Sequence, residues 1–184
     1  MSPRAPNLNW RGVESFVPSM WPTLAIAALA WLHVFAAVGW MGAVMTLVLA
    51  LGPGLRGMSQ TARLEFFATL VPRYGRYVAA LSGLTIVFGA LLAVSEYDAL
   101  FSPMTVEGTY VMVGALLALV AFLFVMFLVV PTARKVGAAS AKALKDGSAP
   151  SELVSMQRRF RSLGGVGLVL LVLILVLMIA AAWT

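Results

Sequence analysis

The sequence predicts an all-α integral membrane protein, a four-transmembrane-helix bundle with both chain termini on the outer side. Of its 184 residues, 61% are hydrophobic and 11% are charged, whereas a soluble domain carries about 25% charged residues. Four apolar stretches reach the roughly 20 helical residues that cross a bilayer, and the basic residues lie between them on one side. We therefore treat residues 1–184 as a single membrane domain.

None of the four predicted spans contains Lys, Arg, Asp or Glu; they cover about residues 22–51, 78–94, 109–130 and 163–183. Arg4 and Arg11 precede the first span, as basic residues do in a secretion signal. Its apolar run, however, continues to Leu51, which exceeds the roughly 7–15 apolar residues of such a signal. We therefore expect this span to be retained.

The distribution of basic residues predicts the orientation. Segments 52–77 and 131–162 hold eleven of the 13 Lys and Arg residues, and segment 96–108 holds none but contains Glu96, Asp98 and Glu107. Cytoplasmic loops retain an excess of Lys and Arg during membrane insertion. The two basic segments are thus expected to be the cytoplasmic loops of a multi-pass plasma-membrane protein with extracytoplasmic termini.

Both cytoplasmic segments contain helical signals. Ser59 is a capping residue for a helix that we expect to end before Pro72 and to lie along the inner interface as an amphipathic helix. Residues 138–145 are good helix formers followed by Gly147, which predicts a second helix that ends there.

The two halves of the chain share a layout. Each has a span, a stop at Gly52-Pro53 or Val130-Pro131, a basic segment with an aromatic-basic cluster at 73–77 or 158–161, and a returning span. This layout is typical of two repeated helical hairpins. It is also what any four-span protein shows when its basic loops are cytoplasmic, and both interpretations stay open.

Pairs of small residues four apart indicate where membrane helices approach closely. The first three spans contain the pairs Gly39 and Ala43, Ala79 and Gly83, and Gly114 and Ala118. These spans are expected to pack together. The fourth span is almost wholly Leu, Val and Ile from Leu168 to Met178, and we expect it to face lipid or an oligomer contact.

The sequence contains few side chains that could carry out catalysis. The chain has no cysteine, so disulfides and thiol nucleophiles are excluded. Its sole histidine is His33, and we expect no Ser/His/Asp set and no hydrolytic catalysis inside the membrane. The net charge of +6 resides between the apolar runs, which indicates a membrane surface and not a nucleic acid as partner. A redox activity remains open.

Residues 31–42, which read WLHVFAAVGWMG and continue to Leu51-Gly52-Pro53, resemble the opening helix of the copper-resistance protein D (CopD) membrane domain. They are also similar to the start of the HemJ-type membrane haem proteins. HemJ-type proteins pair the histidine with a lysine in a later helix, and no span here contains lysine. The resemblance therefore implies copper or haem binding as a class, without protoporphyrinogen oxidation.

His33 is the first candidate site residue, because an ionisable side chain inside a span is costly in lipid and is often functional. Counting back from Leu51 places it near the outer boundary of the bilayer, and counting from Pro22 places it near the middle. The alternative to a ligand is a neutral imidazole that reaches the interface or is hydrogen-bonded to a polar neighbour, for which Thr85, Ser82 and Tyr110 are available.

Three further residues complete the candidate site. At the outer-boundary depth, Met112 and Met178 are expected near His33, and imidazole with thioether suits copper(I) as well as haem b. We take His33 and Met112 as candidate metal ligands and Met178 as a further cofactor contact. Methionine is also a common filler of apolar cores. Trp40 follows on the same helical face with small residues between, which leaves room for a flat ligand or for plain helix packing.

Three functions follow from these patterns. The first is a CopD-like membrane protein that binds copper or haem b near the outer face, for copper handling or electron transfer. The second is a non-catalytic subunit or assembly factor of a larger membrane complex, in keeping with the scarcity of polar groups. A small transporter is disfavoured because no span contains a charged residue. The expected partners are the bilayer and either a second copy or a larger complex.

Overall fold

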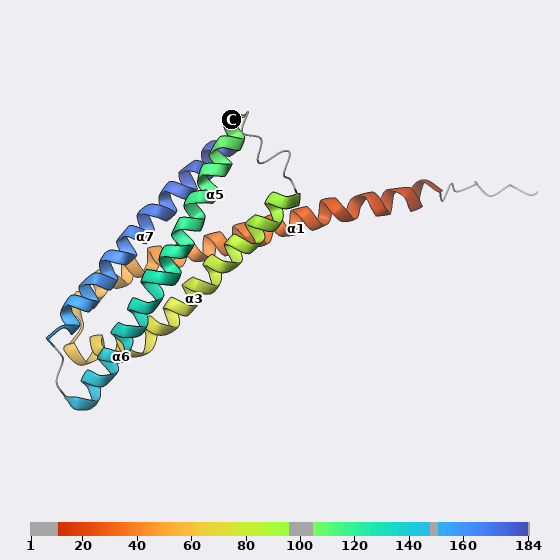
Figure 1. Ribbon diagram of the computed structural model, residues 1–184. Coiled ribbons are helices and arrows are strands. Elements are labelled where there is room, and N and C mark those ends of the chain that lie inside the picture. The colour runs from red at the N-terminus through yellow and green to blue at the C-terminus, as the bar shows by residue number, and fades with distance from the viewer. Residues whose placement is uncertain (1–10, 96–104, 148–150, 184) are drawn as a thin grey trace, which may run out of the picture.

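The computed structural model describes residues 11–95, 105–147 and 151–183, with the side chains of 11–22 left out. These residues form helices and short connections without a β-strand. Four helical stretches are long and apolar enough to cross a membrane, Thr23–Gly57, Gln60–Ser95, Val106–Asp146 and Leu153–Ala182 (Figure 1). The prediction of an all-α four-helix membrane protein is confirmed. The acidic segment with Glu96 and Asp98 lies outside the described residues.

Each span is built from one or more helical elements. The first comprises α1 (Arg11–Met45), the π-helical η1 (Thr46–Leu51), α2 (Gly52–Gly54) and the 3-10 turn η2 (Leu55–Gly57). The second is α3 (Gln60–Ser95). The third joins α5 (Val106–Phe124), the π-helical η3 (Val125–Val129) and α6 (Val130–Asp146), and the fourth is α7 (Leu153–Ala182).

A π-helical turn precedes the proline of both the first and the third span. The N–H of Gly52 bonds to the Leu47 carbonyl, and the N–H of Val130 bonds to the Val125 carbonyl, each five residues back. A proline lacks the N–H and crowds the carbonyl four residues earlier. A widened turn directly before the proline accommodates both effects, and such turns recur at functional positions.

The chain behaves differently after the two prolines. It turns back shortly after Pro53, whereas it continues as α6 through Pro131 as far as Asp146. The predicted stop at Val130-Pro131 is therefore wrong. A π turn precedes both prolines, so it accommodates a proline within a helix without deciding whether the chain turns back after it. The predicted end at Gly147 is confirmed by its left-handed conformation, with φ 66°. The two halves share the π turn and proline but differ in where the hairpin closes.

Pro72 does not end its helix either. α3 runs unbroken through it, so the predicted interfacial helix is wrong and this segment stands in line with the span. The Pro72 ring packs on Gly137 of α6, where a Cβ atom would overlap the ring. Phe67 and Val71 are buried in the same cluster as Val136 of α6. Packing against α6 thus compensates for the hydrogen bond that the proline cannot make.

The helices pair unequally. α3 packs along both α1 and α6, and α5 packs along α7 (Figure 1). A Cβ atom at Gly39 would lie 3.3 Å from Leu81 of α3, whereas one at Gly114 would meet Met178 of α7. α7 does expose a row of valines, but its opposite face packs along α5, a pairing that the pattern of small residues did not predict.

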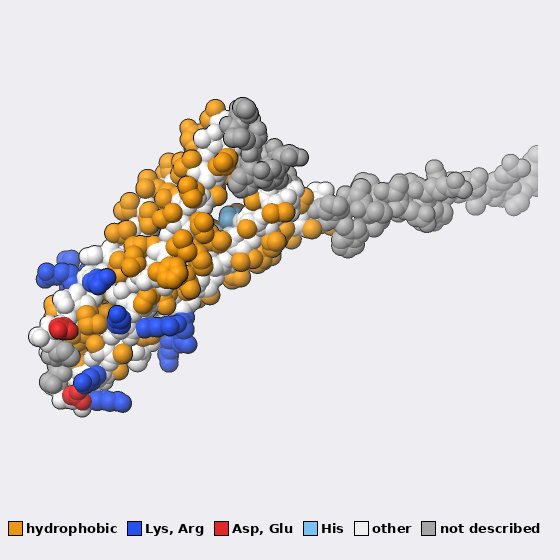
Figure 2. Space-filling model, viewed as in Figure 1, with side chains coloured by type: hydrophobic (Ala, Val, Ile, Leu, Met, Phe, Trp, Pro, Cys, Tyr) orange, Lys and Arg blue, Asp and Glu red, His pale blue; other side chains and the backbone are white. Residues whose placement is uncertain are grey.

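A row of small buried residues on α6 forms its contact with α3: Ala133, Gly137, Ser140 and Ala143. A Cβ atom at Gly75 of α3 would lie 3.2 Å from Ala133. The row brings the two backbones close together at the end of the bundle that carries the basic residues. There the Lys and Arg side chains gather around the start of α3, the start of α7 and the length of α6, while the rest of this face is apolar (Figure 2).

Candidate functional site

His33 lies on α1 and is bound to α3. Its Nδ1 is 2.9 Å from the backbone carbonyl oxygen of Thr85. A carbonyl only accepts hydrogen bonds, so Nδ1 carries the proton and Nε2 of the neutral ring keeps its lone pair. The Thr85 hydroxyl donates instead to the Leu81 carbonyl at 2.8 Å. Of the three predicted partners, Thr85 is the one contacted, through its backbone and not its side chain.

Gly89, one turn beyond Thr85, leaves room for the imidazole. A Cβ atom at Gly89 would lie 2.8 Å from Cε1 and 2.9 Å from Nδ1 of His33. These distances are shorter than any ordinary carbon contact, so any larger residue would displace the ring. Sequence reasoning missed Gly89. Its spacing of four from Thr85 was the available signal, but many membrane helices contain such glycines.

The imidazole is only partly buried. In the space-filling view the pale blue imidazole is visible between side chains of the helices (Figure 2). Within the described ranges, no three His, Cys, Asp or Glu side chains come together in a way that could hold a metal ion. His33 is thus a single nitrogen donor oriented by a backbone carbonyl, an arrangement common for histidines that bind metals.

The two candidate methionines lie on α5 and α7. Met112 of α5 is 41% exposed. Met178 of α7 is partly buried and packs on Gly114, with its sulfur 3.7 Å from where a Cβ atom of that glycine would be. In the described part of the chain, no hydrogen bond joins either sulfur to His33. The structure brings Thr85 and Gly89 to His33. Met178 packs on Gly114, and the ligand role of the two methionines stays a prediction.

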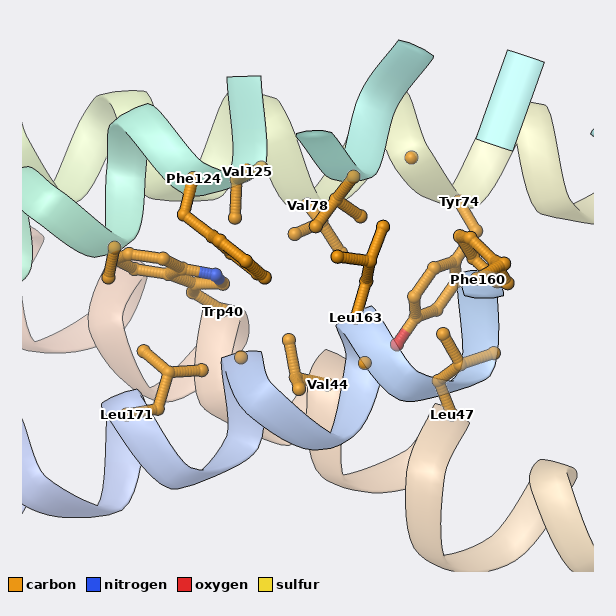
Figure 3. Close-up of a pocket in the computed structure, with 15 residues that line it drawn as sticks. Trp40, Val44, Leu47, Tyr74, Val78, Phe124, Val125, Phe160, Leu163 and Leu171 are labelled. Carbon is orange, nitrogen blue, oxygen red and sulfur yellow. The ribbon is translucent and has the colours of Figure 1, made fainter. Parts of the chain in front are cut away.

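Trp40 occupies a separate place at the centre of the bundle. It is 2% exposed and lines an apolar cavity to which all four spans contribute (Figure 3). Phe124, Tyr74 and Phe160 form aromatic walls of this cavity, and His33 does not line it. The Tyr74 hydroxyl donates to the backbone carbonyl of Ala43.

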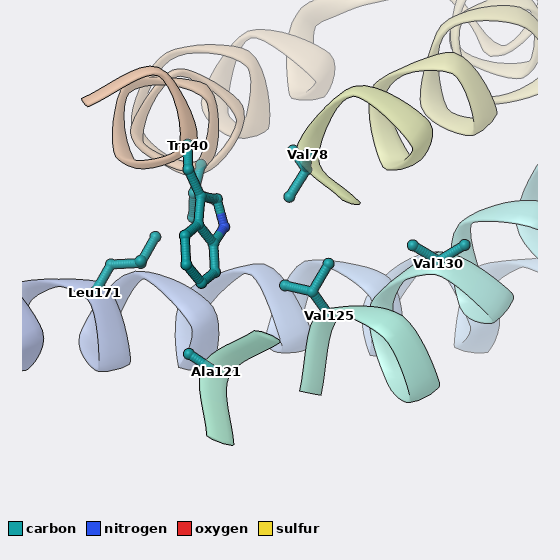
Figure 4. Packing of buried hydrophobic residues seen from close by; sticks show 7 residues of the cluster. Trp40, Val78, Ala121, Val125, Val130 and Leu171 are labelled. Carbon is teal, nitrogen blue, oxygen red and sulfur yellow. The ribbon is translucent and has the colours of Figure 1, made fainter. Parts of the chain in front are cut away.

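The indole N–H of Trp40 is buried without a hydrogen-bond partner among the described residues. The ring extends from α1 into the space between the helices, where it packs with Leu171, Ala121, Val125 and Val78 (Figure 4). A buried donor without a partner costs about 1–3 kcal/mol. Trp40 packs as an apolar residue at the centre of the bundle, two helical turns from the imidazole. His33 does not line the Trp40 cavity, so the two side chains do not share that pocket.

Comparison of the chain with protein-family models, with curated proteins and with solved structures finds no match.

Proposed function

We propose that the chain is a CopD-like membrane protein in which His33 binds haem b or copper near the outer face, for electron transfer or copper handling. The observation that carries this proposal is the hydrogen bond from Nδ1 to the Thr85 carbonyl. It fixes the ring and its tautomer, and it leaves Nε2 as the chain's one imidazole donor.

The donor set favours haem b over copper. Copper(I) is held by several soft or imidazole ligands, and the described residues contain no group of three His, Cys, Asp or Glu side chains that could hold a metal ion. Haem is held by a single axial histidine in some proteins, with the apolar macrocycle packed against side chains. The group would supply reversible one-electron chemistry, while this chain orients the imidazole through the Thr85 carbonyl. A methionine, or His33 of a second copy, would hold the group together with His33.

The orientation is part of the proposal. The Lys and Arg side chains at one end of the bundle (Figure 2) match the excess expected of cytoplasmic segments. With that end in the cytoplasm, both termini are extracytoplasmic and His33 lies in the outer half of the plasma membrane.

The test is the visible spectrum and copper content of the detergent-purified protein, followed by titration with haem. A Soret band supports the haem branch, and stoichiometric copper without a Soret band supports the copper branch. If the protein carries neither and does not bind added haem or copper(I), the proposal fails.

A second candidate function is a subunit or assembly factor of a membrane complex. It is favoured by an unpartnered row on α1, where Trp31 is 77% and Phe35 76% exposed. Lipid would also cover this row. A single cysteine at Phe35, in a chain that has none, should form a disulfide-linked dimer if the row meets a second copy. A monomeric product would leave lipid or another subunit as its neighbour.

A further inference from the structure

A groove lies where the turn after α1 meets the first turns of α7. Its apolar walls come from η1, the following turn, α3 and α7, and include Val48, Leu55, Phe66 and Phe160. Gly164 of α7 also lines it, and a Cβ atom there would be 3.2 Å from Val48. The groove is therefore a mainly apolar recess to which three spans contribute, separate from the His33 site.

Two polar side chains line the groove, Gln157 and Arg161. They are four residues apart on α7, so they lie on the same helical face. Arg161 is exposed, and in the described part of the chain no hydrogen bond or ion pair engages its guanidinium. No acidic residue lines the groove. The groove thus combines apolar walls with an uncompensated positive charge.

The groove also lies at the depth where lipid headgroups are expected. Arg161 directly precedes the apolar run of α7, and Gly52 of the groove directly follows the apolar run of the first span. Arg161 therefore lies at the boundary of both runs. Leu47, Val48 and Gly164 continue the lining of the groove into the two spans, whereas its remaining apolar residues belong to the basic segments.

We propose that this groove binds one anionic phospholipid, with its phosphate on Arg161 and Gln157 and an acyl chain along the apolar walls. The arginine guanidinium matches a phosphate in charge and in its paired donors. Basic residues at this level attract the anionic lipids of the cytoplasmic leaflet. The site does not depend on the cofactor proposal, because neither His33 nor its neighbours take part in it.

The experiment is native mass spectrometry of the full chain purified with phosphatidylglycerol or phosphatidylcholine in mixed micelles. We expect one phosphatidylglycerol to stay bound and phosphatidylcholine to be lost. Arg161→Gln should lower retention several-fold, and Gln157→Leu should lower it less. Arg159→Gln is the matched control, because it removes the same charge from an exposed position about 200° around the same helix and should retain the lipid.

Competition experiments distinguish binding of the intact lipid from binding of other ligands. Inorganic phosphate and a phosphatidylglycerol with short acyl chains should displace the lipid poorly, because they lack a chain long enough for the groove. Equal loss in Arg161→Gln and Arg159→Gln would show diffuse surface charge and overturn the proposal. Equal retention of phosphatidylcholine, or full displacement by inorganic phosphate, would also overturn it.

Discussion

The imidazole of His33 and the backbone carbonyl of Thr85 join α1 to α3 through a hydrogen bond of 2.9 Å. The bond satisfies one ring nitrogen inside an apolar bundle, where an unpaired polar group is costly. It also leaves the second nitrogen without a partner among the described residues. The bond is compatible with a purely structural histidine and with an oriented ligand, and variants distinguish the two.

Replacing His33 tests the ligand role directly. His33→Ala should abolish the Soret band or bound copper, and loss of the bond to Thr85 should cost about 0.5–1.5 kcal/mol of stability. His33→Gln keeps an N–H donor for the Thr85 carbonyl, so it should restore stability but not the cofactor. Visible spectra and thermal unfolding in detergent measure both. Full cofactor occupancy in either variant would end the ligand hypothesis.

Gly89→Ala tests the position of the ring without removing the ligand. The new Cβ atom would lie 2.8 Å from Cε1 of His33, so the imidazole must move. We expect a shifted Soret band and a several-fold lower haem occupancy. Gly42→Ala on α1 is the control, because a Cβ atom there meets nothing within 4 Å. Identical spectra for the two variants would show that Gly89 does not position the ring.

Gly137→Ala should destabilise the fold. The added Cβ atom would overlap the Pro72 ring and lie 3.3 Å from the Phe67 carbonyl oxygen, and such overpacking costs about 1–3 kcal/mol. Gly42→Ala should instead raise stability by up to about 1 kcal/mol through helix propensity. Thermal unfolding in one detergent compares them. If Gly137→Ala is as stable as Gly42→Ala, α3 and α6 do not meet at Pro72.

Ser140→Ala should stabilise the protein. The Ser140 hydroxyl is fully buried and has no partner among the described residues. Removing such a group avoids a desolvation cost of about 1–3 kcal/mol, so a gain of roughly 1 kcal/mol is expected. Ser162→Ala, at an exposed position of α7, should gain only helix propensity. A loss of stability in Ser140→Ala would reveal a partner for the hydroxyl.

Labelling of single cysteines tests the orientation. The chain has no cysteine of its own, so each introduced one reports a single position. Cysteines at Ser2 and Asp98 should react with an impermeant thiol reagent in intact cells, and one at Lys142 should react only after lysis. Reaction of Lys142 alone in intact cells would reverse the proposed topology.

Much of the bundle was predictable because transmembrane character is summed over about 20 residues of local sequence. The four spans appear where the apolar runs lie, and Gly147 ends its helix as a residue free to adopt positive φ. The prolines were misjudged. Whether a proline ends a helix depends on the packing around it, as where Gly137 of α6 lies against the Pro72 ring.

The sequence by itself determined that this is a four-span membrane protein with its positive charge at one end and a single imidazole in the first span. Hydropathy and charge are properties of the residues themselves, so they can be predicted without knowing which residues are in contact. Only the tertiary structure decided what the imidazole contacts. Every residue of α3 has a backbone carbonyl, so the choice of Thr85 depends on how the two helices cross. The same holds for the pairing of α5 with α7, because small residues permit close contact without specifying the neighbour.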